Sequence, residues 1–172
     1  MIYLGIDPGL SGAVASIGDA GELHIVDTPI LKVGKKNEMD TKAASEILRG
    51  MRVTGGNKSW SAPGTSSQVI CAIERVHAFR GQGATSVWTF AQNFGEWLGI
   101  LGCLRIPHEL VTPQAWKRVM MNGMPKEKDA SIQRVHQLFP EADVTLKKHH
   151  GRADALLLAE YIRREFNRPV SS

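Results

Sequence analysis

The amino-acid sequence predicts an α/β fold, in which helices flank a mixed five-stranded sheet, in one domain over residues 1–172. Short apolar runs of strand length fill the first part of the chain and recur near residues 70 and 110. Longer segments with apolar residues at helical spacing lie between these runs and after them. With 42% hydrophobic and 22% charged residues, the 172-residue chain has the composition of a single globular domain rather than of a disordered or fibrous protein.

The first part of the chain predicts a three-stranded meander. Residues 2–6 form an apolar run that ends at the turn signal Asp7-Pro8-Gly9. Two further strand-like runs, 12–17 and 22–27, are separated by a second turn that contains glycine. The polar residues 32–38 then predict a loop.

One helix and one strand are predicted next. Residues 39–52 carry apolar side chains at every fourth position, which favours a helix that covers one face of the sheet. Residues 54–67 have the composition of a loop. Residues 68–74 form an apolar run that predicts a fourth strand, and Glu74 ends it.

The last part of the chain is predicted to be mainly helical. Residues 86–104 have apolar side chains at helical spacing and predict a long amphipathic helix, suited to core or dimer packing. A short fifth strand is predicted at 109–111. Three helices follow, over 113–120, 127–138 and 151–166, and the first of them begins with a proline.

Charge and cysteine content narrow the class of protein. The net charge of +4 favours an acidic partner such as nucleic acid, and residues from Lys117 onward contain 11 Lys and Arg against 7 Asp and Glu. Cys71 and Cys103 lie in apolar stretches and are expected to be buried thiols in a reducing compartment. The sequence shows neither a secretory signal nor a run of about 18 apolar residues, so we expect a soluble, cytoplasmic protein with no membrane partner.

Three acidic residues are predicted to lie at the ends of elements. Asp7 ends the first strand, Glu74 ends the fourth, and Asp154 lies in the first turns of the last helix. The ends of adjacent strands lie about 5 Å apart, so the three carboxylates could converge. Clustered carboxylates suit Mg²⁺ or Mn²⁺, which activate water for phosphodiester hydrolysis. The structural alternatives are a turn at Asp7, an arginine partner for Glu74 and a helix N-terminus stabilised by Asp154.

Several motifs resemble those of one family. They are Gly5-Ile6-Asp7-Pro8-Gly9, Ile73-Glu74 and Gly151-Arg152-Ala153-Asp154-Ala155-Leu156. In order and spacing they resemble the RuvC family of Holliday-junction resolvases over nearly the whole chain. The sequence is most similar to the chloroplast-type (MOC1-like) branch, with which it shares further motifs. These are Asp27-Thr28-Pro29, Trp116-Lys117, Leu138-Phe139-Pro140 and the seven residues 150–156.

The resemblance implies an RNase H-like fold and a structure-selective endonuclease that resolves four-way DNA junctions by paired symmetric nicks. It also implies Mg²⁺ dependence, with Mn²⁺ as a substitute, a homodimer, and no small-molecule cofactor. Asp7, Glu74 and Asp154 are then the catalytic metal ligands. Such a protein is expected in a bacterium or a phage-infected cell, associated with the nucleoid, and a processed organellar protein also fits.

One position departs from the family pattern. Many bacterial members have a fourth ligand three residues before the final Asp, where this sequence has Gly151. His150 is the replacement candidate for metal binding and catalysis, because residues four apart share a helix face and His150 precedes Asp154 by four. His149 is the alternative.

Basic residues are expected to contact the DNA backbone. Lys117 and Lys128 match, by local pattern, residues that the family places beside the scissile phosphate; Lys117 is also a candidate catalytic residue, and Lys126 is an alternative to Lys128. Phe79, in the segment after Glu74, could stack on bases at the branch point. The other expected DNA contacts are Lys35, Lys36, Arg80, Lys147, Lys148 and Arg152. For each of these, a solvated or core-packed side chain is the alternative.

The sequence leaves the dimer contact and the substrate open. The helix at 86–104, with Trp88, Phe90 and Phe94, is expected to form the dimer, while monomer packing of the same residues is the alternative. An RNase H-like nuclease on other structured nucleic acid is a second functional interpretation. A non-catalytic junction-binding module is a third, although it would be expected to have lost one of the three acids. An actin-like ATPase would need a second domain that 172 residues do not contain.

Overall fold

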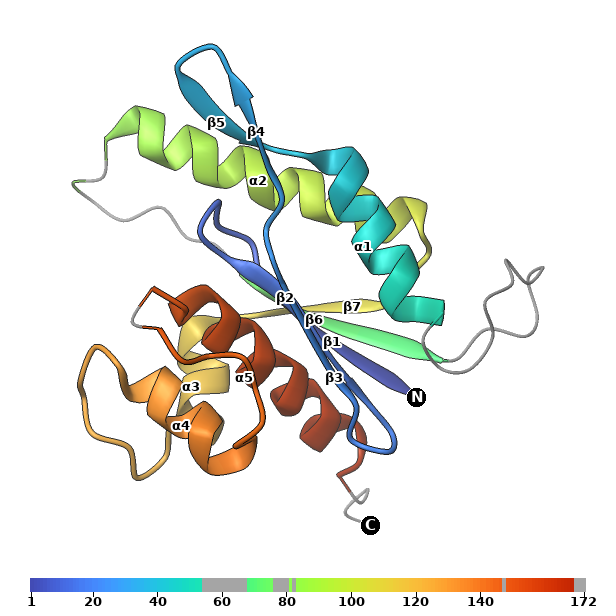
Figure 1. The fold of residues 1–172 in the computed structure, drawn as a ribbon, viewed down its shortest axis with the longest axis vertical. Coiled ribbons are helices and arrows are strands. Elements are labelled where there is room, and N and C mark those ends of the chain that lie inside the picture. Colours follow the sequence, from blue (N-terminus) through green and yellow to red (C-terminus); the bar gives the residue numbers. More distant parts are fainter. Residues whose placement is uncertain (54–67, 76–80, 82, 147, 169–172) are drawn as a thin grey trace.

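A computed structural model describes residues 1–53, 68–75, 81, 83–146 and 148–168. Within these residues, five strands form one mixed sheet with helices on both faces (Figure 1), which confirms the predicted α/β fold. The strands of the sheet are β1 (Ile2–Asp7), β2 (Ala13–Gly18), β3 (Leu23–Asp27), β6 (Val69–Glu74) and β7 (His108–Val111). The helices are α1 (Thr41–Val53), α2 (Ala84–Cys103), α3 (Pro113–Met120), α4 (Ala130–Leu138) and α5 (His150–Phe166).

β1 is the central strand, because the order in the sheet is β3-β2-β1-β6-β7. It pairs antiparallel with β2 and parallel with β6, and β6 pairs parallel with β7. The first three strands therefore form the predicted meander. Parallel pairing places the carboxyl ends of β1 and β6 at the same edge of the sheet.

Alternation along β1 divides the core into two layers. Leu4 and Ile6 pack with α1 and α2 on one face, whereas Tyr3 packs with α3, α4 and α5 on the other. Gly5 shares the face of Tyr3, and a Cβ atom at this position would collide with the backbone of Ala155 in α5. Because Gly5 has no side chain, α5 lies directly against β1.

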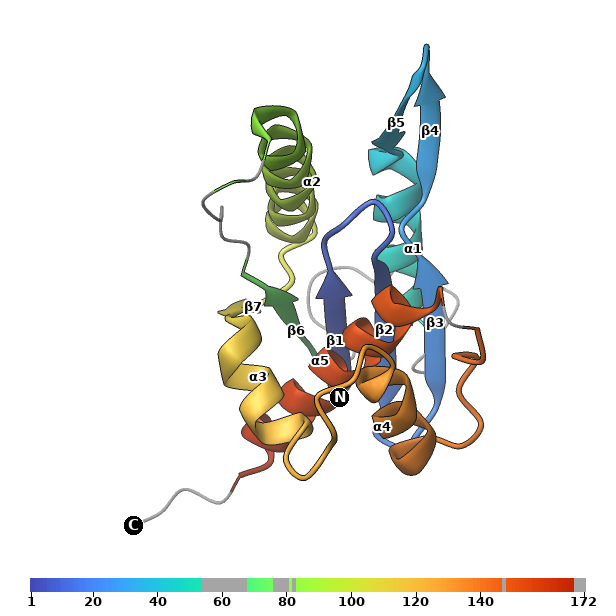
Figure 2. The same cartoon turned by 90° about the vertical axis from the view of Figure 1, so that its left-hand side faces the viewer.

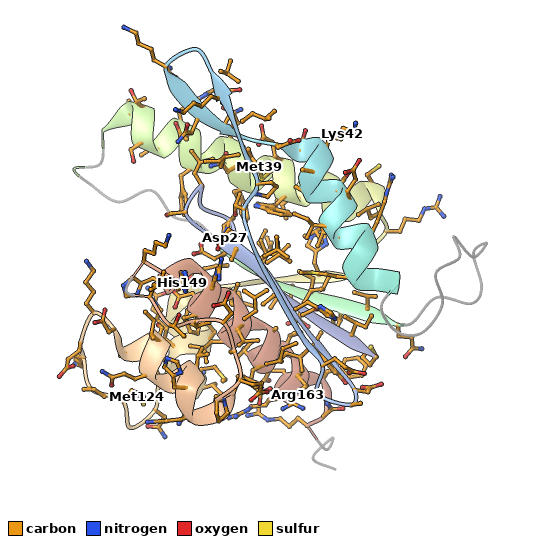
Figure 3. All side chains as sticks on the ribbon, viewed as in Figure 1. Asp27, Met39, Lys42, Met124, His149 and Arg163 are labelled. Carbon is orange, nitrogen blue, oxygen red and sulfur yellow. The ribbon has the colours of Figure 1, made fainter. Side chains whose placement is uncertain are left out.

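The prediction of a loop over 32–38 is wrong. This segment belongs to a two-stranded hairpin, β4 (Ile30–Val33) and β5 (Lys36–Met39), whose turn begins at Gly34 with a φ of +62°. Glycine at the first turn position is typical of a tight hairpin turn, and the polar composition concealed this signal. Figures 1 and 2 show the hairpin projecting beyond the sheet, and Figure 3 labels Met39 at its base, where the side chain is buried against the α1 and α2 layer.

Smaller corrections concern helix starts and one thiol. α1 begins at Thr41 rather than at residue 39, because the Asp40 carboxylate accepts a hydrogen bond from the Ala43 amide, as an N-cap does. Cys71 is buried, but Cys103 is exposed at the end of α2, so the expectation of two buried thiols is wrong for Cys103. The predicted loop over 54–67 lies outside the described residues. Among the helices described here, none has both the length and the apolar character needed to cross a bilayer.

Candidate active site

Asp7 and Glu74 lie side by side at the carboxyl edge of the sheet. They end β1 and β6, and the parallel register between these strands extends to the residue before each acid. Alternation places Asp7 on the face of Tyr3, and Glu74 on the face of Ala72, and both of these apolar residues pack beneath α5. The two carboxylates therefore share one face and one edge of the sheet.

α5 brings Asp154 to the same place. The side chains of Asp7, Glu74 and Asp154 lie close enough for the charge of Asp154 to raise the pKa of both strand acids. Burial, followed by the charges of Asp154 and Glu74, raises the pKa of Asp7 to about 7. Burial is also the main cause that raises the pKa of Glu74 and of Asp154. The predicted convergence of three acids is thus present in the fold.

α3 supplies the groups that oppose this accumulation of negative charge. Trp116 is fully buried, and its indole N–H donates a 2.8 Å hydrogen bond to Glu74 Oε1. The ammonium group of Lys117 lowers the pKa of all three acids and lies 5.0 Å from the centre of the Trp116 ring. Thr112 caps this helix by accepting from the Ala115 amide, which sets where α3 begins.

Two residues near Asp154 and His150 were not predicted: Ser131 beside Asp154, and Asp129 beside His150. A side-chain hydrogen bond from Ser131 in α4 lowers the pKa of Asp154, as does the nearby charge of His150. His150 Nε2 lies 3.5 Å from Asp129 Oδ1. His149 is buried, and its charge lowers the pKa of Asp27 at the end of β3 instead. Figure 3 labels His149 near Asp27. Of the two histidines, His150 is the one beside the carboxylates.

The donor groups fit a divalent cation. Asp154 Oδ1 is buried and has no hydrogen-bond partner among the described residues, and three partly buried carboxylates meet there. Such oxygens are the ligands that Mg²⁺ and Mn²⁺ prefer. In the conformation described for these residues, no three His, Cys, Asp or Glu side chains have the geometry of a metal site.

Two solved structures share this arrangement of elements. The Thermus thermophilus RuvC structure has a TM-score of 0.59 at 15% identity, over 96% of this chain and 97% of that one. The T. thermophilus RuvC in complex with a Holliday junction substrate has a TM-score of 0.57 at 13% identity, over 96% of each chain. This chain has a RuvC-like fold. The similarity to RuvC that the motifs predicted is confirmed for the fold. Identities this low are evidence for the fold alone.

A curated relative matches part of the RuvC-like chain. The chloroplastic Holliday junction resolvase MOC1 of Chlamydomonas reinhardtii is 36% identical over 83 residues, which are 47% of this chain. The matched part is 9% of the relative's length, so the chain spans far less than two thirds of that protein. No protein-family model matches the chain.

Gly151, at the start of α5 in this RuvC-like fold, has no space for a side chain. A Cβ atom there would collide with the Ser11 carbonyl and lie 2.7 Å from Gly12 Cα. The helix therefore begins in direct contact with the turn that follows Asp7. A fourth ligand at this position would require the turn to move.

The remaining predicted DNA contacts are dispersed in the RuvC-like chain. Lys35 lies in the turn of the β4–β5 hairpin and Lys36 in β5, rather than in a loop. Lys126 and Lys128 are exposed in the segment before α4, which begins at Ala130 rather than at residue 127. The exposed Lys148 lies near Asp27, whose pKa its charge lowers. Phe79, Arg80 and Lys147 lie outside the described residues.

Arg152, also predicted to bind DNA, is engaged within the chain. Its guanidinium makes a two-point ion pair with Asp27, with distances of 2.6 and 2.8 Å, and a third bond of 2.6 Å to Asp143. The hydrogen bond from Arg152 is the main cause that lowers the pKa of Asp27. The sequence contained no signal for this contact, because the two partners are separated by 125 residues.

Proposed function

We propose that this protein is a metal-dependent endonuclease that resolves four-way DNA junctions by paired symmetric nicks. The main observation in support of this proposal is that Asp7, Glu74 and Asp154 converge at one edge of a RuvC-like sheet, with Lys117 beside them. Support for the substrate comes from the relatives. One *Thermus* RuvC structure contains a Holliday junction substrate, and the partial match from *Chlamydomonas* is a Holliday junction resolvase.

Asp7, Glu74 and Asp154, with His150, would hold Mg²⁺, and Mn²⁺ would substitute. When bound, the ion supplies a Lewis acid and activates water for attack on the phosphodiester. The pKa of about 7 means that Asp7 must give up a proton near neutral pH before it can act as a ligand. The bond from Trp116 keeps Glu74 Oε1 engaged and leaves Oε2 as the oxygen available for ligation.

Lys117 is proposed as the catalytic cation. It is exposed, and its charge already acts on all three carboxylates, so it lies where a scissile phosphate would approach. There it would oppose the negative charge that grows on the phosphate in the transition state. The other proposed backbone contacts are Lys35, Lys36, Lys128 and Lys148, together with Arg80 and Lys147 in the segments that are not described. Phe79, also in such a segment, is proposed to stack on bases at the branch point.

Symmetric nicking requires two active sites, and we assign the dimer contact to α2. The inward face of this helix carries the buried Asn93, Trp97 and Leu101. Trp88 is 72% exposed on α2, whereas Phe90 and Phe94 are only partly exposed. A two-fold contact between α2 helices would cover Trp88 in both copies.

The deciding experiment is cleavage of a synthetic four-way junction with Mg²⁺, analysed on both strand pairs beside a linear duplex and an RNA–DNA hybrid. Paired symmetric nicks in the junction alone are the expected result. Indiscriminate cleavage, or cleavage of the hybrid, would indicate a nuclease for other nucleic acids. Binding without cleavage would indicate a non-catalytic module. The Asp7→Asn variant should bind the junction as tightly as the wild type and should not cut it, because it loses metal affinity but no phosphate contact.

A further inference from the structure

Arg152 joins three segments that are distant in sequence. It lies in the first turn of α5, between His150 and Asp154. Its Nε and Nη2 donate to the two carboxylate oxygens of Asp27, the last residue of β3. Its Nη1 donates to the carboxylate of Asp143 at 2.6 Å and to the Asp143 carbonyl at 3.2 Å, in the segment between α4 and α5.

The guanidinium is nearly saturated by these contacts. Among the described residues, four hydrogen bonds leave one of its five N–H groups without an acceptor, and the side chain is 19% exposed. Its partners Asp27 and Asp143 are 61% and 75% exposed, so the surface here presents two carboxylates for one arginine. Lys148 and His149 are the neighbouring basic groups on the side of Asp27. An approaching phosphate would meet the outer carboxylates before it reached Arg152.

The position of the first turn of α5 determines where His150 and Asp154 lie relative to Asp7 and Glu74, because this turn carries His150 and leads into Asp154. The helix packs on the sheet through apolar side chains and two close approaches at glycines, with Gly151 against the turn after Asp7 and Gly5 against Ala155. Apolar packing and glycine contacts permit close approach but supply no directional bonds. The two-point pair with Asp27 is directional, because the planar guanidinium matches a carboxylate in one orientation.

We propose that Arg152 is a positioning residue for the metal-binding carboxylates and does not contact DNA. It fastens the first turn of α5 to the edge of the sheet through Asp27 and to the preceding segment through Asp143. The distance between Asp154 and Asp7 is thereby set. The inference rests on the proposed function for the identity of these acids as metal ligands, and it replaces the sequence-based assignment of Arg152 to DNA.

Three variants test the positioning role of Arg152: Arg152→Lys, Asp27→Asn and Asp143→Asn. Arg152→Lys keeps the charge and removes the planar two-point geometry. Lys148→Gln is the matched control for loss of a nearby cation. Mn²⁺ affinity is measured by electron paramagnetic resonance, and amide hydrogen exchange is followed over residues 150–155. Junction affinity is measured in EDTA at several salt concentrations. The cleavage rate is measured separately with Mg²⁺.

The expected result for Arg152→Lys and Asp27→Asn is Mn²⁺ binding weaker by about 10–100-fold, as for other groups that orient metal ligands. Amide hydrogen exchange over residues 150–155 should become faster. The decrease of junction affinity with rising salt should be no steeper than in the wild type. Asp143→Asn should have the same effects to a smaller extent. Lys148→Gln should weaken junction binding and leave Mn²⁺ affinity and amide exchange over residues 150–155 unchanged.

Weaker junction binding in Arg152→Lys, combined with stronger junction binding in Asp27→Asn, would overturn the proposal and return Arg152 to the DNA contacts. Unchanged Mn²⁺ affinity and unchanged exchange in all three variants would overturn it as well. Asp143 is largely exposed, so its variant remains informative if an Arg152 variant fails to fold. A wild type that binds Mn²⁺ but does not cut junctions would refute the proposed function alone.

Discussion

Asp7→Asn should stabilise the metal-free protein at pH 8 even though it abolishes cleavage. The Asp7 carboxyl is buried beside Asp154 and Glu74, and these causes raise its pKa from 3.8 to about 7. At pH 8 the Asp7 carboxylate is therefore charged in both states. The charge is unfavourable in the folded protein, where it is buried beside other acids, and is hydrated by water in the unfolded chain. Asparagine has nearly the same shape, retains an oxygen for the 3.4 Å contact with the Gly9 amide, and has no charge.

The size of the effect follows from the pKa shift. A shift of about 3 units corresponds to about 4 kcal/mol at about 1.4 kcal/mol per unit. Between pH 4 and 7 the folded state binds a proton at Asp7 that the unfolded state has lost, so wild-type stability falls as the pH rises through this window and levels off above it. The advantage of Asp7→Asn should therefore be about 4 kcal/mol at pH 8 and about 2 kcal/mol at pH 5.

Urea unfolding in EDTA at pH 5 and pH 8 measures this difference directly. Glu141→Gln, at an exposed position, is the control and should shift neither midpoint. Added Mg²⁺ should stabilise the wild type at pH 8 and leave Asp7→Asn nearly unchanged, because only the folded wild type offers the complete carboxylate set. An Asp7→Asn protein no more stable than the wild type at pH 8, or equally stabilised at both pH values, would refute the reasoning.

Three further predictions concern the surroundings of the acids. Trp116→Phe removes the 2.8 Å bond to Glu74 and should slow cleavage by about 10–100-fold with junction affinity unchanged; a normal rate in a single-turnover assay would count against the role of Trp116. Gly151→Ala should lower the free energy of unfolding by about 1–3 kcal/mol in urea, because its Cβ would collide with Ser11; an unchanged midpoint would show that the turn yields freely. Lys117→Ala should reduce the cleavage rate far more than junction affinity, and equal losses of both would make Lys117 a simple backbone contact.

Local signals in the sequence were sufficient for the five strands of the main sheet and for the acids at the ends of two of them. Asp7 and Glu74 each follow an apolar run, and strand periodicity then determines which face each acid shares. The amphipathic spacing of α2 likewise predicted a long helix. The β4–β5 hairpin was missed because β5 is largely polar and most residues of both strands are exposed, so no buried face marked them. Its signs were the apolar residues Ile30, Leu31 and Val33 in β4 and the glycine at its turn. Cys103 was misjudged because an apolar neighbourhood in sequence does not determine which side of a helix faces solvent.

The sequence by itself determined the α/β class, the meander and three acids at element ends, because these depend on periodicity and turn chemistry within about ten residues. Only the tertiary structure decided which groups meet those acids. Trp116 reaches Glu74 across 42 residues, and Arg152 reaches Asp27 across 125. Such contacts depend on how α3 and α5 lie against the sheet. For α5, the close approaches at Gly5 and Gly151 permit this packing, and local spacing does not encode them.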